Sequence, residues 1–306
     1  MSDKTGIEWT DATWNPVRGC SRVSEGCRNC YAETVAARFS GPGLPYEGLA
    51  RRTAAGEPRW TGKVRVVETA LEQPLRWTRP RRIFVNSMSD LFHERLPDAD
   101  IDRVFAVMLL APRHTFQILT KRAERMRAYL TAPALYGRIL DAVNLIRQRR
   151  PDLSGFGVSD PTRFPARWIW LGVSVEDQVA ADERIPLLLD TPAAGRFLSC
   201  EPLLGPIDFR KVRGFNRVGL DLSRWWVIVG GESGPNARTM HVQWARQIRD
   251  LCEIAGVPFF FKQWGEWAPD DPNPPLSSVA YSRVGKKAAG ALLDGREHRA
   301  FPGNAR

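Results

Sequence analysis

The stretch from Trp168 to Gln178 has the sequence WIWLGVSVEDQ, an apolar, β-branched run that ends in polar residues. A short run of this kind is typical of a buried strand. Comparable runs recur at Arg82–Ser87, Thr115–Thr120, Gly195–Cys200, Trp225–Gly230 and Val257–Lys262, and Thr13–Val17 is a weaker candidate for a first strand. The chain therefore presents a series of buried strands.

The segments between these runs carry apolar residues at helical spacing. They are Ala99–Leu110, Ala123–Gln148, Asp182–Leu189 and Val242–Ala255. Alternation of strands and helices is typical of a parallel sheet with crossover helices. We expect an α/β fold, a partial or near-complete (β/α) TIM-type barrel with parallel strands, spanning residues 1–267 and followed by a C-terminal extension, 268–306.

One long segment interrupts the alternation, at about residues 41–82. It is rich in Gly, Pro and Arg, and from Tyr46 to Arg82 it holds nine Arg or Lys and four Asp or Glu, with Trp60 and Trp77. Basic residues interleaved with aromatic residues suit a phosphate backbone and its bases. A solvated, irregular insertion is the alternative. The segment Arg147–Arg167 is expected to be a loop.

The composition narrows the class of protein. The chain has 306 residues, a formal net charge of +10 and five cysteines. No apolar run approaches the length of a membrane helix, and the polar start MSDKTGIEWT has no signal-peptide core. We therefore expect a cytoplasmic protein without a membrane partner, and the positive charge favours an acidic partner such as nucleic acid.

Polar residues follow each of the predicted strands. The strand ends are SMSD (Ser87–Asp90), TKR (Thr120–Arg122), SVEDQ (Ser174–Gln178), SCEP (Ser199–Pro202), GGESG (Gly230–Gly234) and KQWGEW (Lys262–Trp267). In a (β/α) barrel the carboxyl ends of the strands meet at one face, which holds the active site. The alternative is that these residues cap the helices that follow.

Three cysteines lie within eleven residues, in the pattern Cys20-x6-Cys27-x2-Cys30. Three thiolates on one loop can ligate a metal centre, and no fourth Cys or His lies nearby, since the nearest histidine is His93. A structural zinc site needs a fourth ligand, whereas an iron-sulfur cluster with three cysteine ligands leaves one iron open. The odd count and the clustering favour ligation over disulfides.

A three-cysteine loop after the first strand of a (β/α) barrel resembles the radical S-adenosylmethionine (SAM) superfamily. The resemblance implies a 4Fe-4S cluster ligated by Cys20, Cys27 and Cys30, SAM as a second cofactor, and an external electron donor. The first cysteine gap here is six residues rather than the usual three. In the superfamily a Gly-Gly-Glu motif after the second strand binds the amino group of SAM. Gly230-Gly231-Glu232 follows a late strand instead, so this role cannot be assigned to it from the sequence match alone.

Nearly the full chain also resembles a bacteriophage-type three-cysteine family of uncharacterised proteins, widespread in phages and bacteria. The matching motifs include IEWTDATWNPVRGC (Ile7–Cys20), CRNCYAE (Cys27–Glu33), NSMSDLFH (Asn86–His93), GVSVEDQ (Gly172–Gln178), SCEPLLGPI (Ser199–Ile207), GGESGPNAR (Gly230–Arg238) and FFKQWGEW (Phe260–Trp267).

The strand ends supply the candidate site residues. Ser87, Ser89, Asp90, Lys121, Ser174 and Glu176 are candidate contacts of SAM, with Arg122 beside Lys121 as a phosphate or carboxylate ligand. Candidate catalytic or substrate contacts are Glu201, Glu232, Lys262 and Cys200, with Gln263 beside Lys262. Cys200 is a candidate donor of a hydrogen atom to a product radical. The alternative is that it is a small buried residue of the core.

Together these features predict a radical SAM enzyme that reductively cleaves SAM to a 5′-deoxyadenosyl radical and modifies or repairs a nucleic acid or nucleotide. The alternative is a nucleic-acid-binding protein stabilised by zinc. A barrel that keeps the cluster without radical chemistry is the third interpretation.

Overall fold

A computed structural model describes residues 5–153, 166–215, 222–275 and 279–303. The chain divides into two compact units. Unit 1 comprises Met1–Ser21, Ala32–Leu171 and Asp190–Gly195, and unit 2 comprises Arg22–Tyr31, Gly172–Leu189 and Arg196–Arg306. Each unit is described by itself below.

The main sheet has the strand order β1-β6-β7-β8-β9-β10-β11 among the described residues. Its strands are β1 (Ala12–Trp14), β6 (Arg82–Val85), β7 (Thr115–Thr120), β8 (Ile169–Ser174), β9 (Gly195–Cys200), β10 (Trp225–Gly230) and β11 (Phe259–Gln263). The order of these seven strands in the sheet is their order in the chain. The pairs β1–β6, β6–β7, β9–β10 and β10–β11 run parallel. This is the order of a (β/α) half-barrel, so the predicted α/β class with parallel strands is confirmed.

Two strands of this sheet, β8 and β10, consist of nearly continuous apolar runs. Every residue of β8 and β10 is buried. A strand covered on both faces has no solvent side, and its sequence therefore lacks alternation. The predicted bounds of β7, β9 and β10 match the observed ones, and β1 is shorter than the predicted first strand.

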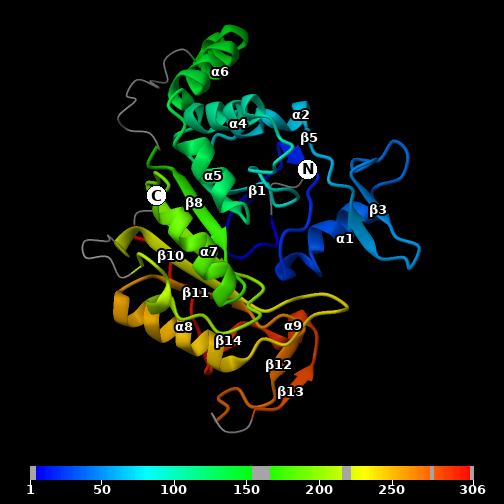
Figure 1. The fold of residues 1–306 in the computed structure, drawn as a ribbon, viewed down its shortest axis with the longest axis vertical. Coiled ribbons are helices and arrows are strands. Elements are labelled where there is room, and N and C mark those ends of the chain that lie inside the picture. Colours follow the sequence, from blue (N-terminus) through cyan, green and yellow to red (C-terminus); the bar gives the residue numbers. More distant parts are fainter. Residues whose placement is uncertain (1–4, 154–165, 216–221, 276–278, 304–306) are drawn as a thin grey trace. The chain divides into compact units, whose positions relative to one another are not determined.

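The helices of unit 1 include α4 (Asp98–Leu110), α5 (Ala123–Leu130) and α6 (Leu135–Arg149), with α4 and α6 packed together (Figure 1). The sequence predicts one helix over Ala123–Gln148, but two form. Pro133 lies in the break, and proline ends a helix because it lacks an N–H and its ring clashes with the preceding turn. The other helices of this region are α1 (Tyr31–Arg38), α2 (Glu68–Leu71), α3 (Gln73–Arg76) and the 3-10 turn η2 (Pro151–Leu153).

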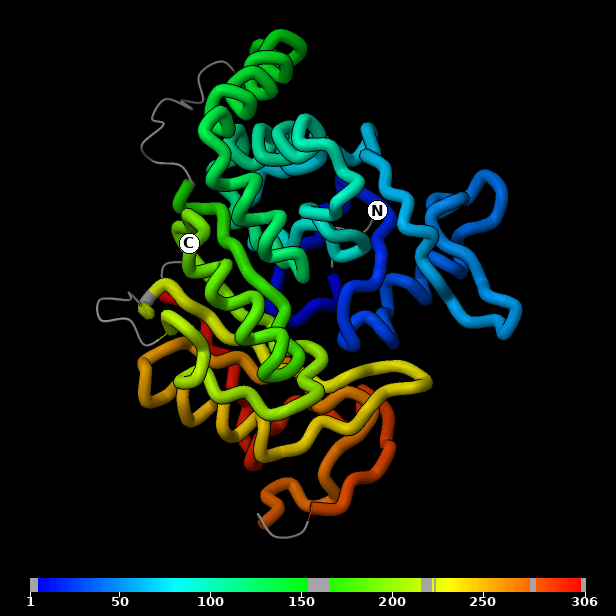
Figure 2. Tube along the Cα trace, viewed as in Figure 1, coloured from blue at the N-terminus to red at the C-terminus, as the bar shows by residue number. Residues whose placement is uncertain are grey.

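The basic insertion contains regular structure that the sequence does not predict. Within it β3 (Ala50–Arg52) pairs antiparallel with β4 (Pro58–Trp60), and its strand β5 (Arg65–Val66) pairs antiparallel with β2 (Val17–Arg18), which precedes the insertion. The β3–β4 hairpin projects from the rest of unit 1 (Figure 2). Most of the predicted loop at Arg147–Arg167 lies outside the described residues, which resume at Ala166.

Unit 2 carries α7 (Gln178–Leu189), α8 (Val242–Ala255) and the end of the chain. The C-terminal segment forms the antiparallel pairs β12 (Trp267–Pro269) with β13 (Tyr281–Arg283) and β14 (Leu292–Leu293) with β15 (Arg296–Glu297), and α9 (Lys286–Ala289) lies between them in the chain. Trp264 Nε1 donates to the Leu292 carbonyl at 2.8 Å, and Trp226 Nε1 to the Ala300 carbonyl at 2.9 Å. These bonds fix the terminal segment to β10 and to the loop after β11. The 3-10 turns of the unit are η1 (Glu25–Cys27), η4 (Phe209–Lys211) and η5 (Leu222–Arg224).

In the part of the chain that the structure describes, no helix is both long enough and apolar enough to cross a bilayer.

Candidate functional site

The cysteine loop begins where β2 ends and continues to the start of α1. Cys20, Cys27 and Cys30 are thiols, each half-buried. Cys20 belongs to unit 1, and the other two belong to unit 2. Gly19 has a φ of +96°, and a Cβ there would lie 2.1 Å from the Lys63 carbonyl oxygen. Only glycine permits this backbone to pass so close to the insertion.

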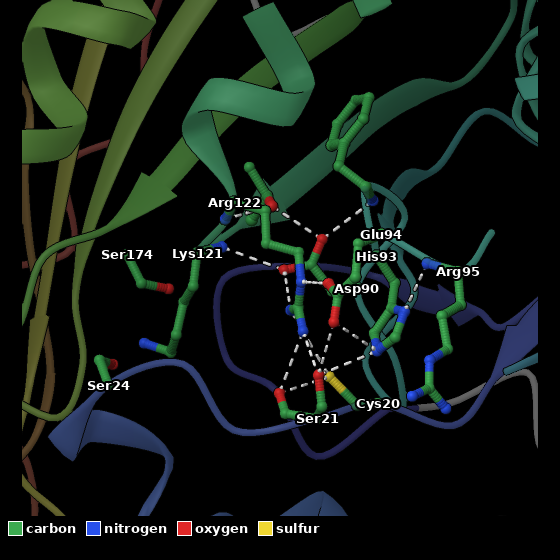
Figure 3. A network of polar contacts seen from close by, with 12 residues as sticks. Cys20, Ser21, Ser24, Asp90, His93, Glu94, Arg95, Lys121, Arg122 and Ser174 are labelled. Atoms are coloured by element: carbon green, nitrogen blue, oxygen red, sulfur yellow. Dashed lines mark hydrogen bonds and ion pairs between the residues drawn. The ribbon is translucent and has the colours of Figure 1, made fainter. Parts of the chain in front are cut away.

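Arg122 connects the end of β7 to the first part of the loop (Figure 3). Its Nη2 donates to the carbonyl and the hydroxyl of Ser21, at 3.2 and 2.7 Å. Its Nη1 lies 3.9 Å from Cys20 Sγ, and its Nε donates to Glu94 at 2.7 Å. A buried guanidinium therefore fixes the Cys20–Ser21 backbone and places positive charge beside a sulfur.

Asp90 balances this charge. Its Oδ2 accepts from Arg122 Nη1 at 3.2 Å and from the backbone of Lys121 at 3.1 Å. Its Oδ1 accepts from Thr120 Oγ1 at 2.7 Å and from the backbone of Phe92 at 3.0 Å. Burial opposes the charge of Arg122, but Asp90, Cys20 and Glu94 raise the Arg122 pKa. Arg122 thus keeps its charge, and the Asp90 carboxyl group is occupied by contacts within unit 1.

His93 is fully buried beside Ser21, and its contacts define the tautomer. Nδ1 accepts from the backbone N–H of Arg95 at 3.1 Å, so Nε2 carries the proton and donates to Ser21 Oγ at 3.0 Å. Burial and the positive charge of Arg122 lower the His93 pKa. His93 is therefore a neutral support of Ser21 with both ring nitrogens engaged.

Ser87 and Ser89 also hold the segment that leads to Cys20. Ser87 Oγ donates to Asn15 Oδ1 at 3.1 Å, and Ser89 Oγ to the Val17 carbonyl at 2.9 Å. The side chain of Lys121 points away from Asp90 in Figure 3. The two serines therefore contact the segment from β1 to β2, and their contact with SAM stays a prediction.

In unit 2, Glu176 holds the middle of the cysteine loop. It is 1% exposed, accepts from Ser24 Oγ at 2.8 Å and pairs with buried Arg184 at 2.8 Å. Arg184 also donates to the carbonyl of Ser174, which is itself buried. A Cβ on Gly26 would lie 2.3 Å from Glu176 Oε1. Glu176 thus packs directly on the loop backbone.

Glu232, after β10, holds the next part of the loop. Asn29 Nδ2 donates to its Oε2 at 2.9 Å, and Arg238 donates to both of its oxygens. Arg238 continues to the carbonyl of Glu25 at 2.9 Å. Burial raises the pKa of Glu232, but the bonds from Arg238 and Asn29 outweigh burial and lower it. Glu232 is therefore an ionised anchor for two residues of the loop.

The remaining candidates of unit 2 lie at the ends of β9 and β11. Lys262 Nζ pairs with Glu201 Oε1 at 3.0 Å, and the two side chains are 17% and 14% exposed. Gln263 is buried and donates to Ser233 Oγ at 3.1 Å. Cys200 is fully buried, and burial raises its thiol pKa. The Lys262–Glu201 pair is thus more open to a ligand than Glu176 or Glu232.

Several residues that hold the cysteine loop or its anchors were not predicted from the sequence. They are Ser21, Ser24, Asn29, His93, Arg184 and Arg238. Ser24 and Asn29 lie inside the cysteine pattern, which was the available signal for them. Asn29 and Glu232 are 203 positions apart in the chain, so only the folded chain reveals the pair.

The loop carries the residue types that a sulfur-ligated metal centre uses, since it has three thiols within eleven residues. Hydrogen bonds from Arg122 to Ser21 and from Ser24 to Glu176 hold its backbone, and the Arg122 guanidinium lies beside the Cys20 sulfur. Among the described residues, no group of three or more His, Cys, Asp or Glu side chains is gathered for a metal. The support for a metal thus comes from the motif and from the anchoring of its loop.

The fold defines the chain as an α/β protein with a parallel, sequentially ordered sheet. It belongs to the family described as "Protein of unknown function (DUF5131)", whose family model matches residues 4–302. No curated protein and no solved structure matches the chain significantly. The predicted membership of an uncharacterised family over nearly the whole chain is thereby confirmed. The radical SAM and bacteriophage links stay predictions.

Proposed function

We propose that the chain is a radical SAM enzyme with a partial TIM-type barrel, in which Cys20, Cys27 and Cys30 ligate a 4Fe-4S cluster. When bound, such a cluster supplies an electron from an external donor for the reductive cleavage of SAM to a 5′-deoxyadenosyl radical. The substrate class that the +10 charge favours is a nucleic acid or nucleotide.

The observation that carries this proposal is the anchoring of the cysteine loop. Within unit 1, Arg122 bonds Ser21 beside Cys20; within unit 2, Glu176 and Glu232 accept from Ser24 and Asn29. A surface loop without a role has no need of three buried acidic or basic anchors, since burying such a group costs desolvation. A metal-ligating loop does need them, because supporting contacts orient the ligands.

The same contacts narrow the candidate ligands of SAM and substrate. Asp90, Glu176 and Glu232 are occupied by protein donors, so we assign them to positioning the loop. Lys262 and Glu201 are the better candidates for contact with a ligand, since their side chains are partly exposed at strand ends. We still propose that Ser174 and Lys121 contact SAM and that Cys200 contacts the substrate.

The zinc alternative requires a fourth ligand near the cysteines. His93, which bonds Ser21 beside Cys20, uses Nδ1 for the Arg95 backbone and Nε2 for Ser21. It would have to give up one of these part-buried hydrogen bonds to bind zinc. This observation favours the cluster over a zinc site completed by His93.

The test is 5′-deoxyadenosine formation. The protein, purified and reconstituted without oxygen, is incubated with SAM and dithionite, and the nucleoside is quantified by mass spectrometry. We expect formation that depends on protein and reductant, that is lost in Cys27→Ala and that persists in Cys252→Ala, a buried cysteine outside the loop. A protein that holds its cluster and yields no nucleoside contradicts the radical step.

A further inference from the structure

The basic insertion of unit 1, together with Arg18 of β2, presents arginines in an arrangement that opposes folding. In the β2–β5 pair Arg18 lies directly opposite Arg65, and in the β3–β4 pair Arg51 lies directly opposite Arg59. Like charges directly across an antiparallel pair are destabilising. Two such pairs, one within the insertion and one between the insertion and β2, indicate that these charges serve a purpose other than stability.

Carbonyl oxygens, rather than carboxylates, hold several of these side chains. Arg18 and Arg65 both donate to the Pro45 carbonyl, at 3.3 and 2.7 Å, and Arg52 donates to the Gly56 carbonyl at 2.8 Å. A carbonyl oxygen orients a guanidinium without neutralising it. The side chains are therefore ordered while their charge stays available.

Carboxylates neutralise little of this surface. Glu57 pairs with Arg59 at 2.6 Å, whereas buried Glu33 accepts from the Trp60 backbone. Across the described residues, no ion pair reaches the remaining cations of the surface, which are Arg18, Arg51, Lys63, Arg65 and, from the neighbouring turn, Arg95.

Aromatic packing makes the surface rigid. The Arg18 guanidinium lies 5.3 Å from the centre of the Tyr46 ring, and the Tyr46 and Trp60 rings are 6.4 Å apart. These contacts connect β2 to the β3–β4 hairpin. A rigid set of cations loses less entropy when it binds a charged chain.

The surface adjoins the first cysteine. Arg18 is two residues before Cys20, and Gly19 touches the Lys63 backbone closely enough to exclude a Cβ. Arg95, which donates to the Gly62 carbonyl, follows His93 and Glu94 of the network around Cys20. An anion held by the insertion would therefore lie beside the Cys20 end of the cysteine loop.

We propose that this surface, formed by Arg18, Arg51, Arg59, Lys63 and Arg65, binds the phosphate backbone of a nucleic acid strand; Arg52, which follows Arg51 on β3, lies on the other face of the hairpin. Phosphates at regular spacing supply the missing counter-charge, and release of their counterions drives binding. The inference rests on the proposed function only for the chemistry that follows binding, since binding itself needs no cluster.

The test measures binding of a fluorescein-labelled oligothymidine by anisotropy over a range of salt concentrations. The variant R51Q/R65Q removes one arginine from each opposed pair. Its matched control, K211Q/R213Q, removes two exposed cations of unit 2. Iron content and thermal melting are recorded for each protein, so that loss of binding is separable from loss of the cluster or of the fold.

We expect R51Q/R65Q to bind more weakly, with the slope of log affinity against log salt reduced by about 1.4, since each lost single-strand phosphate contact removes about 0.7. Its melting temperature should not fall, because opposed like charges are relieved. The control should keep the wild-type slope. The proposal is overturned if wild type does not bind, if both double variants lose binding equally, or if polyglutamate binds as tightly as the oligonucleotide. A protein that binds the oligonucleotide but does not cleave SAM contradicts the proposed function and not this proposal.

Discussion

Asp90, Glu176 and Glu232 are strand-end carboxylates whose surroundings decide their role. Each is buried, and each accepts hydrogen bonds from an arginine of its own unit. A carboxylate with such partners is poorly available to an incoming ammonium group. At the scale of the residue, we propose that Asp90 and Glu176, expected to contact SAM, and Glu232, expected to contact the substrate, hold the loop that carries the cysteines.

Gly26 tests the close contact between the loop and Glu176. In Gly26→Ala the new methyl would lie 2.3 Å from Glu176 Oε1, so the carboxylate or the loop must move. We expect a loss of about 1–3 kcal/mol in the free energy of unfolding, measured with urea. Gly137→Ala, in α6 with no neighbour within 4 Å, should leave stability unchanged or raise it by up to about 1 kcal/mol. Equal effects in the two variants would contradict the contact.

His114 gives a prediction for pH. Burial lowers its pKa from 6.5 to about 4, while Nε2 donates to the Pro74 carbonyl at 3.1 Å. The unfolded chain therefore binds more protons between these pH values, and stability falls as the pH falls. Between pH 7 and pH 5 we expect His114 to account for a loss of about 2 kcal/mol. Urea unfolding of His114→Gln should show a decline smaller by this amount; an unchanged decline would refute the assignment.

Arg122 acts at the scale of elements, because it joins the end of β7 to the turn at Asp90 and to the loop at Ser21. Arg122→Gln leaves the buried Asp90 carboxylate without its counter-charge. We expect a loss of about 3–5 kcal/mol in the free energy of unfolding. The variant should also exchange amide hydrogens faster at residues 19–21, as measured by mass spectrometry.

Two further variants distinguish this pair from a general effect of charge. Arg125→Gln, whose partner is the partly exposed Asp98, should cost no more than about 1 kcal/mol. Asp90→Asn combined with Arg122→Gln should be more stable than Arg122→Gln alone. If the double variant is instead the less stable, Asp90 and Arg122 do not act as a pair.

The sequence predicts the main elements because their signals are local. The runs at β7, β9 and β10 each have apolar residues at their centre, and α8 has one apolar stripe. The pairs in the insertion escape prediction because strands such as Arg65–Val66 are too short to show a pattern. The C-terminal strands depend on contacts such as Trp264 with the Leu292 carbonyl, which a periodicity does not reveal.

The candidate site, like the fold, could be predicted from the sequence only in part. The cysteine spacing and the polar strand ends are visible in the sequence. Which of those polar residues face a ligand is not, because it depends on partners elsewhere in the chain. Arg238, for example, occupies Glu232 and reaches Glu25, 213 positions away.

At the scale of the whole molecule, the net charge of +10 and the cysteine motif are the two features that a single function must explain. The first is prominent in the insertion and at Arg18 beside it, where Glu57 is the carboxylate partner of Arg59 and the opposed Arg18, Arg51 and Arg65 have no ion pair among the described residues. The second lies on a loop anchored within both units. An enzyme that holds a cluster and acts on a polyanion accounts for both.

The metal content of the protein tests the central claim most directly. Iron, acid-labile sulfide and zinc are counted per chain after purification without oxygen, in wild type, Cys27→Ala and Cys252→Ala. The account predicts about four irons and four sulfides in wild type and Cys252→Ala, and their loss in Cys27→Ala. One zinc per chain without sulfide, even after reconstitution with iron and sulfide, would contradict it.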